Sequence, residues 1–172
     1  GGATVGITLG IDPGMKGGWA LLDDGDYVVG GRMPTKAYGK RRQVDTEALL
    51  DHMIYMREDA ETDWDDYFPP DRVVVEMVFS SPQMGVVSAM SLGMAQGAAL
   101  AVANRVCKRQ EPVLVTPKVW KAAFGLGPDK RASLSLCADY WPSDTNLWTV
   151  LANDGIAEAA LMARWLDQSR AH

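Results

Sequence analysis

The sequence predicts an α/β domain with a mixed central sheet of about five strands and helices on both faces. Apolar, β-branched segments alternate with segments that have the apolar periodicity of helices, and no internal repeat or low-complexity linker separates them. Residues 73–79 are apolar at almost every position, which is typical of a strand covered on both faces. The 172 residues, 47% of them hydrophobic, are enough for one substantial core. We expect a single domain over residues 1–172, with flexible ends at 1–4 and 168–172.

The N-terminal part of the chain predicts an antiparallel meander of three strands. Residues 5–12, 17–22 and 27–33 are rich in apolar and β-branched side chains. Asp24 and Gly25 separate the second and third segments, and this dipeptide favours a two-residue hairpin turn.

The remaining segments predict helices that alternate with two further strands. The strands are expected at residues 73–79 and 113–115. The helices are expected at residues 45–56 and 83–106, and after the helix-start residues Thr116, Asp129 and Asn153, the last one running to about Asp167.

Four carboxylates lie in apolar surroundings, where an unpaired charge is costly. Asp12 ends the first strand just before a Pro-Gly turn, and Glu76 interrupts the apolar segment 73–79. Asp154 and Glu158 are four residues apart and therefore share one face of an otherwise apolar helix. The alternatives are a buried ion pair for Glu76, a helix-dipole interaction for Asp154 and a solvated helix face for Glu158. We favour the interpretation that all four acids converge on divalent metal.

The type of ligand predicts which metal these acids bind. Carboxylates without histidine or cysteine suit Mg²⁺ or Mn²⁺ rather than Zn²⁺. Carboxylates from two strands and one helix can hold two ions about 4 Å apart, and such a pair supports phosphodiester hydrolysis. We expect two Mg²⁺ ions per site, with Mn²⁺ as a substitute, as the only cofactor. The predicted catalytic and metal-binding residues are Asp12, Glu76, Asp154 and Glu158.

The formal net charge of −5 taken alone argues against a nucleic-acid partner, because nucleic-acid-binding domains are usually basic. The basic residues are clustered, however, at 36–42, 118–121 and 130–131. Such clusters can contact a phosphate backbone. The alternative for 36–42 is a solvated polar loop, and residues 58–66 are expected to form an acidic, solvated helix end or loop.

The segment from residue 79 to residue 104 has no charged side chain and is long enough to cross a bilayer. It also contains serines, glutamines and glycines and lacks flanking Trp or Tyr anchors, so we favour a buried central helix and expect no membrane contact. Ala89, Gly93, Gly97 and Ala101 recur every four residues and form a stripe that lets another backbone approach. Packing on the sheet and a dimer interface are both compatible with this small-residue stripe.

Cys107 and Cys137 fit neither a zinc-ligand spacing nor a disulfide framework. A reducing, intracellular location is therefore expected.

These segments together resemble the RuvC-like Holliday junction resolvases of the RNase H-like superfamily, over residues 5–166. Residues 10–14 (Gly-Ile-Asp-Pro-Gly) look like the first catalytic strand of the family, and residues 75–79 (Val-Glu-Met-Val-Phe) look like the second. The other matching pieces follow in the family's order. The pattern of Gly85, Ser88, Gly93 and Gly97 resembles the long interface helix. Residues 115–117 with Trp120 and Lys121, then Asp129 with Lys130, resemble the DNA-facing basic segment, and residues 154–159 resemble the terminal acidic motif.

One feature of the last motif departs from the bacterial pattern. Bacterial members place two Asp residues three apart, whereas Gly155 stands three residues before Glu158 here. The Asp-x-x-x-Glu form resembles the phage and plant-organelle branches more closely than bacterial RuvC. This resemblance implies a cytoplasmic location, in the host if the protein is phage-encoded, or an organelle stroma if it is of plant type.

The resemblance implies an RNase H-like fold and a DNA endonuclease that acts in recombination and repair. The enzyme would be a homodimer, paired through helix 83–106, that nicks a four-way junction symmetrically and leaves 5′-phosphate and 3′-hydroxyl ends. Phe79 would stack on a base near the crossover, unless it is a core residue at a strand end. The implied DNA-contacting residues are Lys40, Arg41, Arg42, Phe79, Lys118, Lys121, Lys130 and Arg131.

Other functions are compatible with the same residues. A broader branched-DNA or flap endonuclease of a phage would use the same acids, and a catalytically silent junction-binding protein would keep only the basic surface. An actin-like or sugar-kinase-like nucleotide-binding protein also begins with a strand, an Asp and a Gly-rich turn, but that fold needs a second, similar half for which this chain is too short.

Overall fold

The computed structural model describes residues 6–55, 69–107 and 109–169. The order of strands across its main sheet is β3 (Asp26–Arg32), β2 (Gly18–Asp23), β1 (Ile7–Asp12), β6 (Arg72–Glu76) and β7 (Val113–Val115). Strands β3, β2 and β1 are antiparallel neighbours, whereas β1, β6 and β7 run parallel. The sheet is therefore mixed, as predicted.

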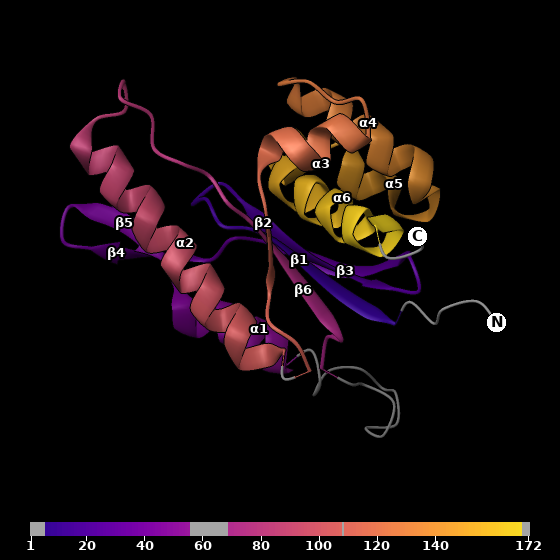
Figure 1. The fold of residues 1–172 in the computed structure, drawn as a ribbon, viewed down its shortest axis with the longest axis horizontal. Coiled ribbons are helices and arrows are strands. Elements are labelled where there is room, and N and C mark those ends of the chain that lie inside the picture. The colour runs from indigo at the N-terminus through magenta and orange to yellow at the C-terminus, as the bar shows by residue number, and fades with distance from the viewer. Residues whose placement is uncertain (1–5, 56–68, 108, 170–172) are drawn as a thin grey trace.

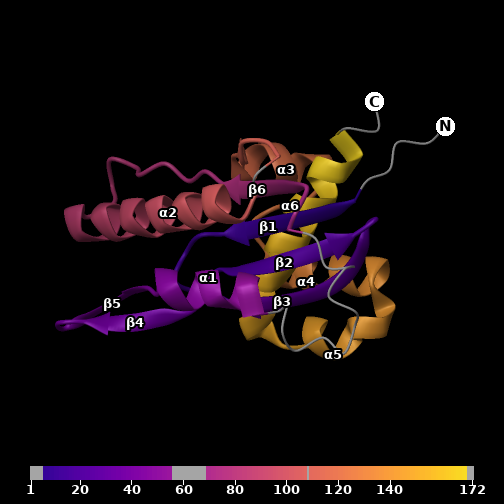
Figure 2. The same cartoon turned by 90° about the horizontal axis from the view of Figure 1, so that it is seen from below.

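Helices cover both faces of this sheet, as Figures 1 and 2 show. One face carries α1 (Thr46–Tyr55) and α2 (Val86–Val106). The other face carries α6 (Asp154–Ser169), with α3 (Pro117–Ala123), α4 (Lys130–Tyr140) and α5 (Thr145–Trp148) around it. The structure therefore confirms the predicted α/β class and its layers.

The two hydrophobic cores follow from the alternation of side chains along the central strands. Ile11 and Val75 belong to the core shared with α1 and α2, which includes Leu49. Val74, which precedes Val75 on β6, belongs to the core shared with α6, which includes Leu161. All of these side chains are fully buried, so neither face of β1 or β6 is open to water.

Helix α6 lies unusually close to the sheet because glycines remove the side chains between them. A Cβ atom at Gly10 on β1 would overlap the carbonyl oxygen of Ala159 on α6. A Cβ atom at Gly155 would likewise overlap the backbone of Gly17. The first turns of α6 therefore rest directly against the backbone of β1 and of the turn that precedes β2.

A buried ion pair fixes the far end of α6. The Thr8 hydroxyl donates to Asp167 Oδ1 at 2.6 Å, and Arg72 Nη2 lies 3.2 Å from the same oxygen. Both charged side chains are only 8% exposed. Burial raises the pKa of the Asp167 carboxyl, and the Thr8 hydroxyl and the Arg72 guanidinium oppose this rise.

The polar segment 36–42 belongs to an antiparallel hairpin rather than to a loop. Strands β4 (Thr35–Tyr38) and β5 (Arg41–Val44) pair with each other as a separate two-stranded sheet. Gly39 has φ +60° at the tip, a conformation that favours glycine. The turn signal and the buried Val44 at the hairpin base outweigh the high polarity of the segment.

Several predicted boundaries are wrong by two or three residues. Strand β6 ends at Glu76 rather than at residue 79, and α2 begins at Val86 rather than at residue 83. Helix α6 continues to Ser169, so residues 168–169 are not a flexible end. Asn153 precedes α6, but its side chain accepts from Arg32 and donates to the Leu147 carbonyl. Residues 1–4, 58–66 and 170–172 lie outside the described residues.

Helix α2 is not the buried central helix that the sequence predicts. Its C-terminal half packs on the sheet through Ala99 and Ala103, whereas Val86 and Met90 are 85% and 65% exposed. Figure 2 shows α2 and the β4–β5 hairpin extending in the same direction beyond the sheet. Of the described helices, α2 alone is long and apolar enough to cross a membrane by length and composition.

The buried ion pair yields a prediction about stability. Replacing Arg72 with Met removes the cation that faces the buried Asp167 carboxylate. We expect the free energy of unfolding, measured by urea denaturation, to fall by about 3 kcal/mol.

The double variant Arg72→Met, Asp167→Leu is the matched control, because it replaces both charges with apolar groups and should recover most of the loss. A double variant as unstable as the single one would show that the ion pair is not the source of the effect.

Candidate active site

Asp12 stands at the end of β1, before a tight turn in which the Gly17 amide donates to the Gly14 carbonyl. The Gly14 amide lies 3.4 Å from Asp12 Oδ1. No lysine or arginine of the described residues forms an ion pair with this carboxylate. Desolvation raises the pKa of Asp12 well above its usual value, and repulsion from Glu76 and Glu158 raises it further.

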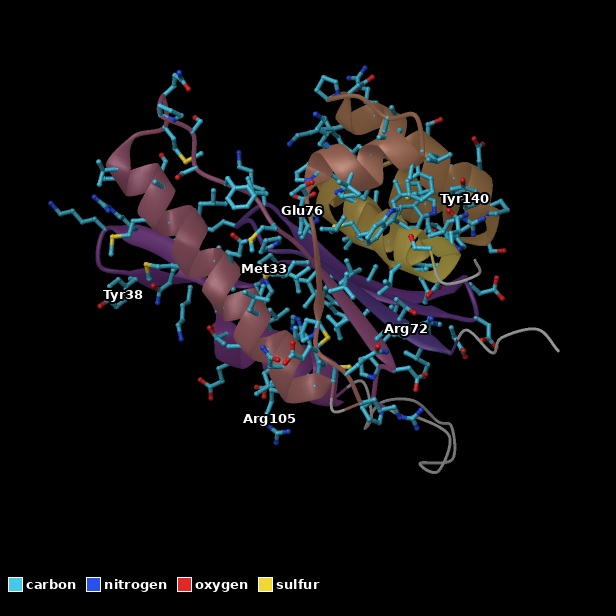
Figure 3. The ribbon with its side chains drawn as sticks, viewed as in Figure 1. Met33, Tyr38, Arg72, Glu76, Arg105 and Tyr140 are labelled. Atoms are coloured by element: carbon cyan, nitrogen blue, oxygen red, sulfur yellow. The ribbon has the colours of Figure 1, made fainter. Side chains whose placement is uncertain are left out.

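Glu76 ends β6, the strand beside β1, and its side chain is 6% exposed. Trp120 Nε1 donates to Glu76 Oε2 at 2.7 Å. Burial raises the pKa of Glu76, and the Trp120 hydrogen bond opposes this rise. Gln96 on α2 donates to the Glu76 carbonyl at 2.8 Å, so the strand end is held from both faces of the sheet. Figure 3 shows Glu76 and Arg72 at opposite ends of β6.

The other two acids lie in the first turns of α6. The Glu158 side chain is 14% exposed and that of Asp154 is 13% exposed. Glu158 interacts with both Asp12 and Glu76, and a hydrogen bond between the Asp12 and Glu158 carboxyls also raises the pKa of Asp12. Three carboxylates from β1, β6 and α6 therefore lie close enough to interact, whereas the sequence predicts a convergence of four.

Two predicted DNA-contacting lysines form ion pairs with acids of this cluster. Lys121 Nζ lies 3.3 Å from Glu158 Oε1, and Lys130 Nζ lies 3.0 Å from Asp154 Oδ2. The hydrogen bond to Asp154 raises the pKa of Lys130, and the charges of Glu158 and Asp12 add to the rise. Asp154 is therefore linked to Glu158 and Asp12 through Lys130.

The donor chemistry of the cluster fits a hard divalent cation. Every candidate ligand is a carboxylate oxygen, and burial, followed by repulsion from neighbouring carboxylates, raises the pKa values of Asp12 and Glu76. In the described part of the chain, however, no three His, Cys, Asp or Glu side chains form a set already arranged to hold a metal ion. Lysines occupy oxygens of Glu158 and Asp154 instead.

The other predicted DNA-contacting residues are spread over two surfaces. Lys118 on α3 and Arg131 on α4 are exposed on the helices that carry Lys121 and Lys130. The second surface is the β4–β5 hairpin, where Lys40 lies at the tip and Arg41 and Arg42 lie on β5. All three side chains are exposed.

Phe79 lies beyond the end of β6 and is 71% exposed. The alternative interpretation of Phe79 as a core residue is therefore wrong.

The sequence did not predict the roles of Trp120 and Gln96 at this site. Trp120 is fully buried, so its apolar character alone predicts a core position. No spacing rule connects it with Glu76, which lies 44 residues earlier in the chain. The one sequence feature that could have pointed to a role for Trp120 is its position next to Lys121, a predicted DNA-contacting residue, on a short helix.

Comparison with known proteins supports the fold. No family model matches the sequence, and no curated protein is similar to it in sequence. The structure is similar to that of RuvC from Thermus thermophilus in complex with a Holliday junction substrate, with a TM-score of 0.53 and 17% identity over 95% of each chain. A second structure of Thermus thermophilus RuvC gives a TM-score of 0.46, again with 17% identity and 95% of each chain. The chain therefore has the RNase H-like fold of RuvC.

The raised pKa of Asp12 predicts how stability depends on pH. The folded pKa lies above the unfolded value near 3.8, so the folded state binds more protons between these two values. Without metal, we expect wild-type stability to fall as pH rises from about 4 through the folded pKa. The Asp12→Asn variant lacks this carboxyl group, so its stability should fall less steeply over the same pH range.

Thermal unfolding of both proteins in EDTA across this pH range tests the expectation. Parallel curves for the two proteins would contradict a desolvated, repelled carboxylate at Asp12.

Proposed function

We propose that this protein is a divalent-metal-dependent endonuclease that resolves four-way DNA junctions. The observation that carries the proposal is the meeting of Asp12, Glu76 and Glu158 at the ends of two neighbouring strands and on the helix that crosses them. The RuvC-like fold supports it, because the structurally similar RuvC was solved with a Holliday junction substrate. The Asp-x-x-x-Glu form of the last acidic motif resembles the phage and plant-organelle branches more closely than bacterial RuvC.

The acids and lysines have complementary parts in the proposed reaction. Asp12, Glu76 and Glu158, with Asp154, would hold two Mg²⁺ or Mn²⁺ ions. Bound ions of this kind activate a water and stabilise the leaving oxygen, which here would give 5′-phosphate and 3′-hydroxyl ends. Trp120 keeps Glu76 oriented, because its indole N–H binds one carboxylate oxygen and leaves the other free.

Lys121 and Lys130 would exchange partners when DNA and metal bind. In the structure they neutralise Glu158 and Asp154, at 3.3 and 3.0 Å. With Glu158 and Asp154 engaged as ligands, both ammonium groups would be available to contact phosphates near the scissile bond. Lys118 and Arg131, exposed on the same two helices, would extend this basic surface.

A homodimer through α2 is part of the proposal. A Cβ atom at Gly93 or Gly97 would meet nothing within 4 Å, so this part of the small-residue stripe faces open space. Val86, which is 85% exposed, lies on the same side of the helix. A second copy that packs here would bury an apolar surface and give two active sites related by a two-fold axis.

The rival functions share the site and differ in substrate. A flap or branched-DNA endonuclease would cut three-way and flapped DNA as well as four-way junctions, and a silent binding protein would cut none. A cytoplasmic location, or an organelle stroma for a plant-type enzyme, is proposed along with the function.

The first functional prediction concerns cleavage. A labelled four-way junction with Mg²⁺ or Mn²⁺ should be nicked symmetrically by the wild type and not by Asp12→Asn or Glu76→Gln. Both variants should still bind the junction in a gel-shift assay, because the basic surface is intact. Asp139→Asn, an exposed acid on α4, is the control and should cut like the wild type.

Loss of folding in both acid variants would identify the acids as structural. Binding of the junction by the wild type without cleavage in either metal would favour the silent binding protein.

The second functional prediction concerns the dimer. Gly97→Leu places a large side chain in open space, so the folded protomer should tolerate it while the helix pair should not. We expect the mass from light scattering to fall from dimer to monomer, with far-UV circular dichroism unchanged. Ser135→Leu, on the exposed surface of α4, should leave the mass unaltered. A dimeric Gly97→Leu variant would place the interface elsewhere.

A further inference from the structure

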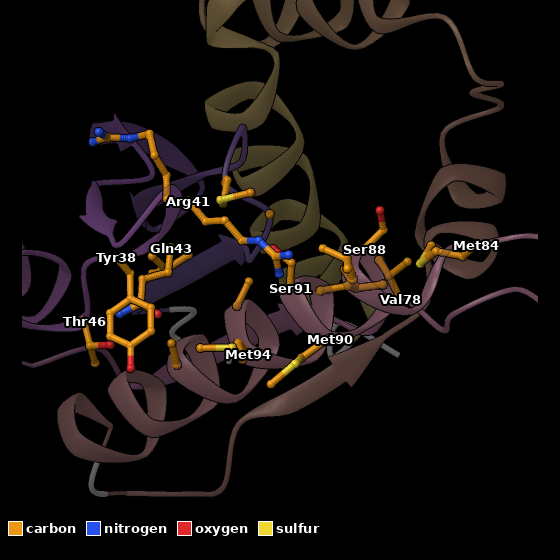
Figure 4. A pocket seen from close by; sticks show the side chains of 18 residues that line it. Tyr38, Arg41, Gln43, Thr46, Val78, Met84, Ser88, Met90, Ser91 and Met94 are labelled. Atoms are coloured by element: carbon orange, nitrogen blue, oxygen red, sulfur yellow. The ribbon is translucent and has the colours of Figure 1, made fainter.

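A groove with a volume of about 990 Å³ lies between the β4–β5 hairpin and the N-terminal half of α2. Figure 4 shows Tyr38 and Gln43 from the hairpin side and Met90 and Met94 from α2 around this hollow. Ligand sites in proteins span about 300–1,000 Å³, so the groove has room for a ligand of nucleotide size.

The groove begins at the candidate active site. Gly14, two residues after Asp12, and Val78, two residues after Glu76, both line it. A DNA strand with a phosphate at the acid cluster could therefore continue into the groove.

The groove exposes large apolar side chains from both elements. Tyr38 is 69% exposed, Met90 65% and Met94 47%. Exposed apolar groups gathered in a hollow mark a binding surface. A tyrosine ring offers a face on which a base can stack, and methionine adapts its shape to different partners.

The hairpin adds positive charge to these apolar side chains. Residues 35–44 contain four basic residues and no acid, in a protein whose formal net charge is −5. Arg41 and Arg42 both line the groove. Arg42 donates to the Thr35 hydroxyl and carbonyl at 3.0 and 2.7 Å, which fixes its position. The combination of exposed apolar groups and arginines is complementary to a base attached to a phosphate.

The groove is separate from the proposed dimer face. The small-residue stripe passes through Gly93 and Gly97, and neither of them lines the groove. A second copy packed on the stripe would therefore leave the groove available to another ligand. Charge complementarity favours an anionic strand as that ligand over a second copy of an acidic protein.

We propose that the groove binds an unpaired nucleotide of the branched DNA, next to the scissile phosphate. The base lies against Tyr38 and the methionines, and Arg41 contacts the adjoining phosphate. This proposal rests on the proposed function for the identity of the substrate, but binding in the groove requires neither metal nor cleavage.

Binding of a labelled oligothymidylate to the full chain in EDTA tests the proposal, with a duplex of the same length for comparison. Loss of one base–aromatic stack in Tyr38→Ala should weaken oligonucleotide binding about tenfold, with little change for the duplex. Tyr38→Phe keeps the ring and should restore affinity, and Val28→Ala, exposed on β3, is the surface control. Arg41→Gln should lower the salt slope by about 0.7, the value for one contact with a single strand.

Photocrosslinking of an oligonucleotide that carries 5-iododeoxyuridine should identify Tyr38 or Met90. Oligonucleotide binding unaffected by Tyr38→Ala, or crosslinks confined to other surfaces, would overturn the proposal. A loss of dimer mass in Tyr38→Ala would do the same, because a second copy would then occupy the groove. If the groove proposal fails but the protein still cuts junctions, the proposed function stands. If binding depends on Tyr38 but the protein cuts no junction, the groove proposal stands and the proposed function does not.

Discussion

Helix α6 reaches the backbone of β1 because Gly10 has no side chain. The space that a Cβ atom would need at Gly10 is taken by the carbonyl oxygen of Ala159, the neighbour of Glu158. Asp12 lies two residues after Gly10 on the same strand. This backbone contact, together with that of Gly155 with Gly17, therefore brings a helix acid to a strand acid. The buried pair of Arg72 and Asp167 fixes the other end of the same helix.

The cluster that results has more negative than positive charge. Asp12 has no ion-pair partner among the described residues, and burial and mutual repulsion raise its pKa and that of Glu76. The groups that moderate this charge come from the two helices that follow β7. Trp120 and Lys121, adjacent on α3, bind Glu76 and Glu158 respectively. Helix α3 therefore connects an acid of the sheet with an acid of α6.

Because helical periodicity places its side chains on different faces, α2 contacts three different surroundings. Ala99 and Ala103 pack on the sheet, Gly93 and Gly97 face open space, and Met90 and Met94 meet the hairpin groove. This helix has no charged residue before Arg105, which raised the possibility of a membrane span. Its apolar character is consistent with three contact surfaces in place of one. A protein that has to contact both a second copy and DNA would use such a helix as their common support.

The sequence by itself determined the α/β class and the order along the chain of the five strands of the main sheet, and it singled out four acids as candidates. These follow from local rules. A buried strand needs apolar residues, and a carboxylate among them is costly unless a cation or a hydrogen-bond donor meets it. The Asp24 and Gly25 turn is another local result, with φ values of 48° and 87° that suit a two-residue hairpin. Only the tertiary structure decided the hairpin at 35–44, the exposure of α2 and the partners of the acids. These features depend on contacts between segments far apart in the chain, such as Trp120 with Glu76, and no local pattern encodes them.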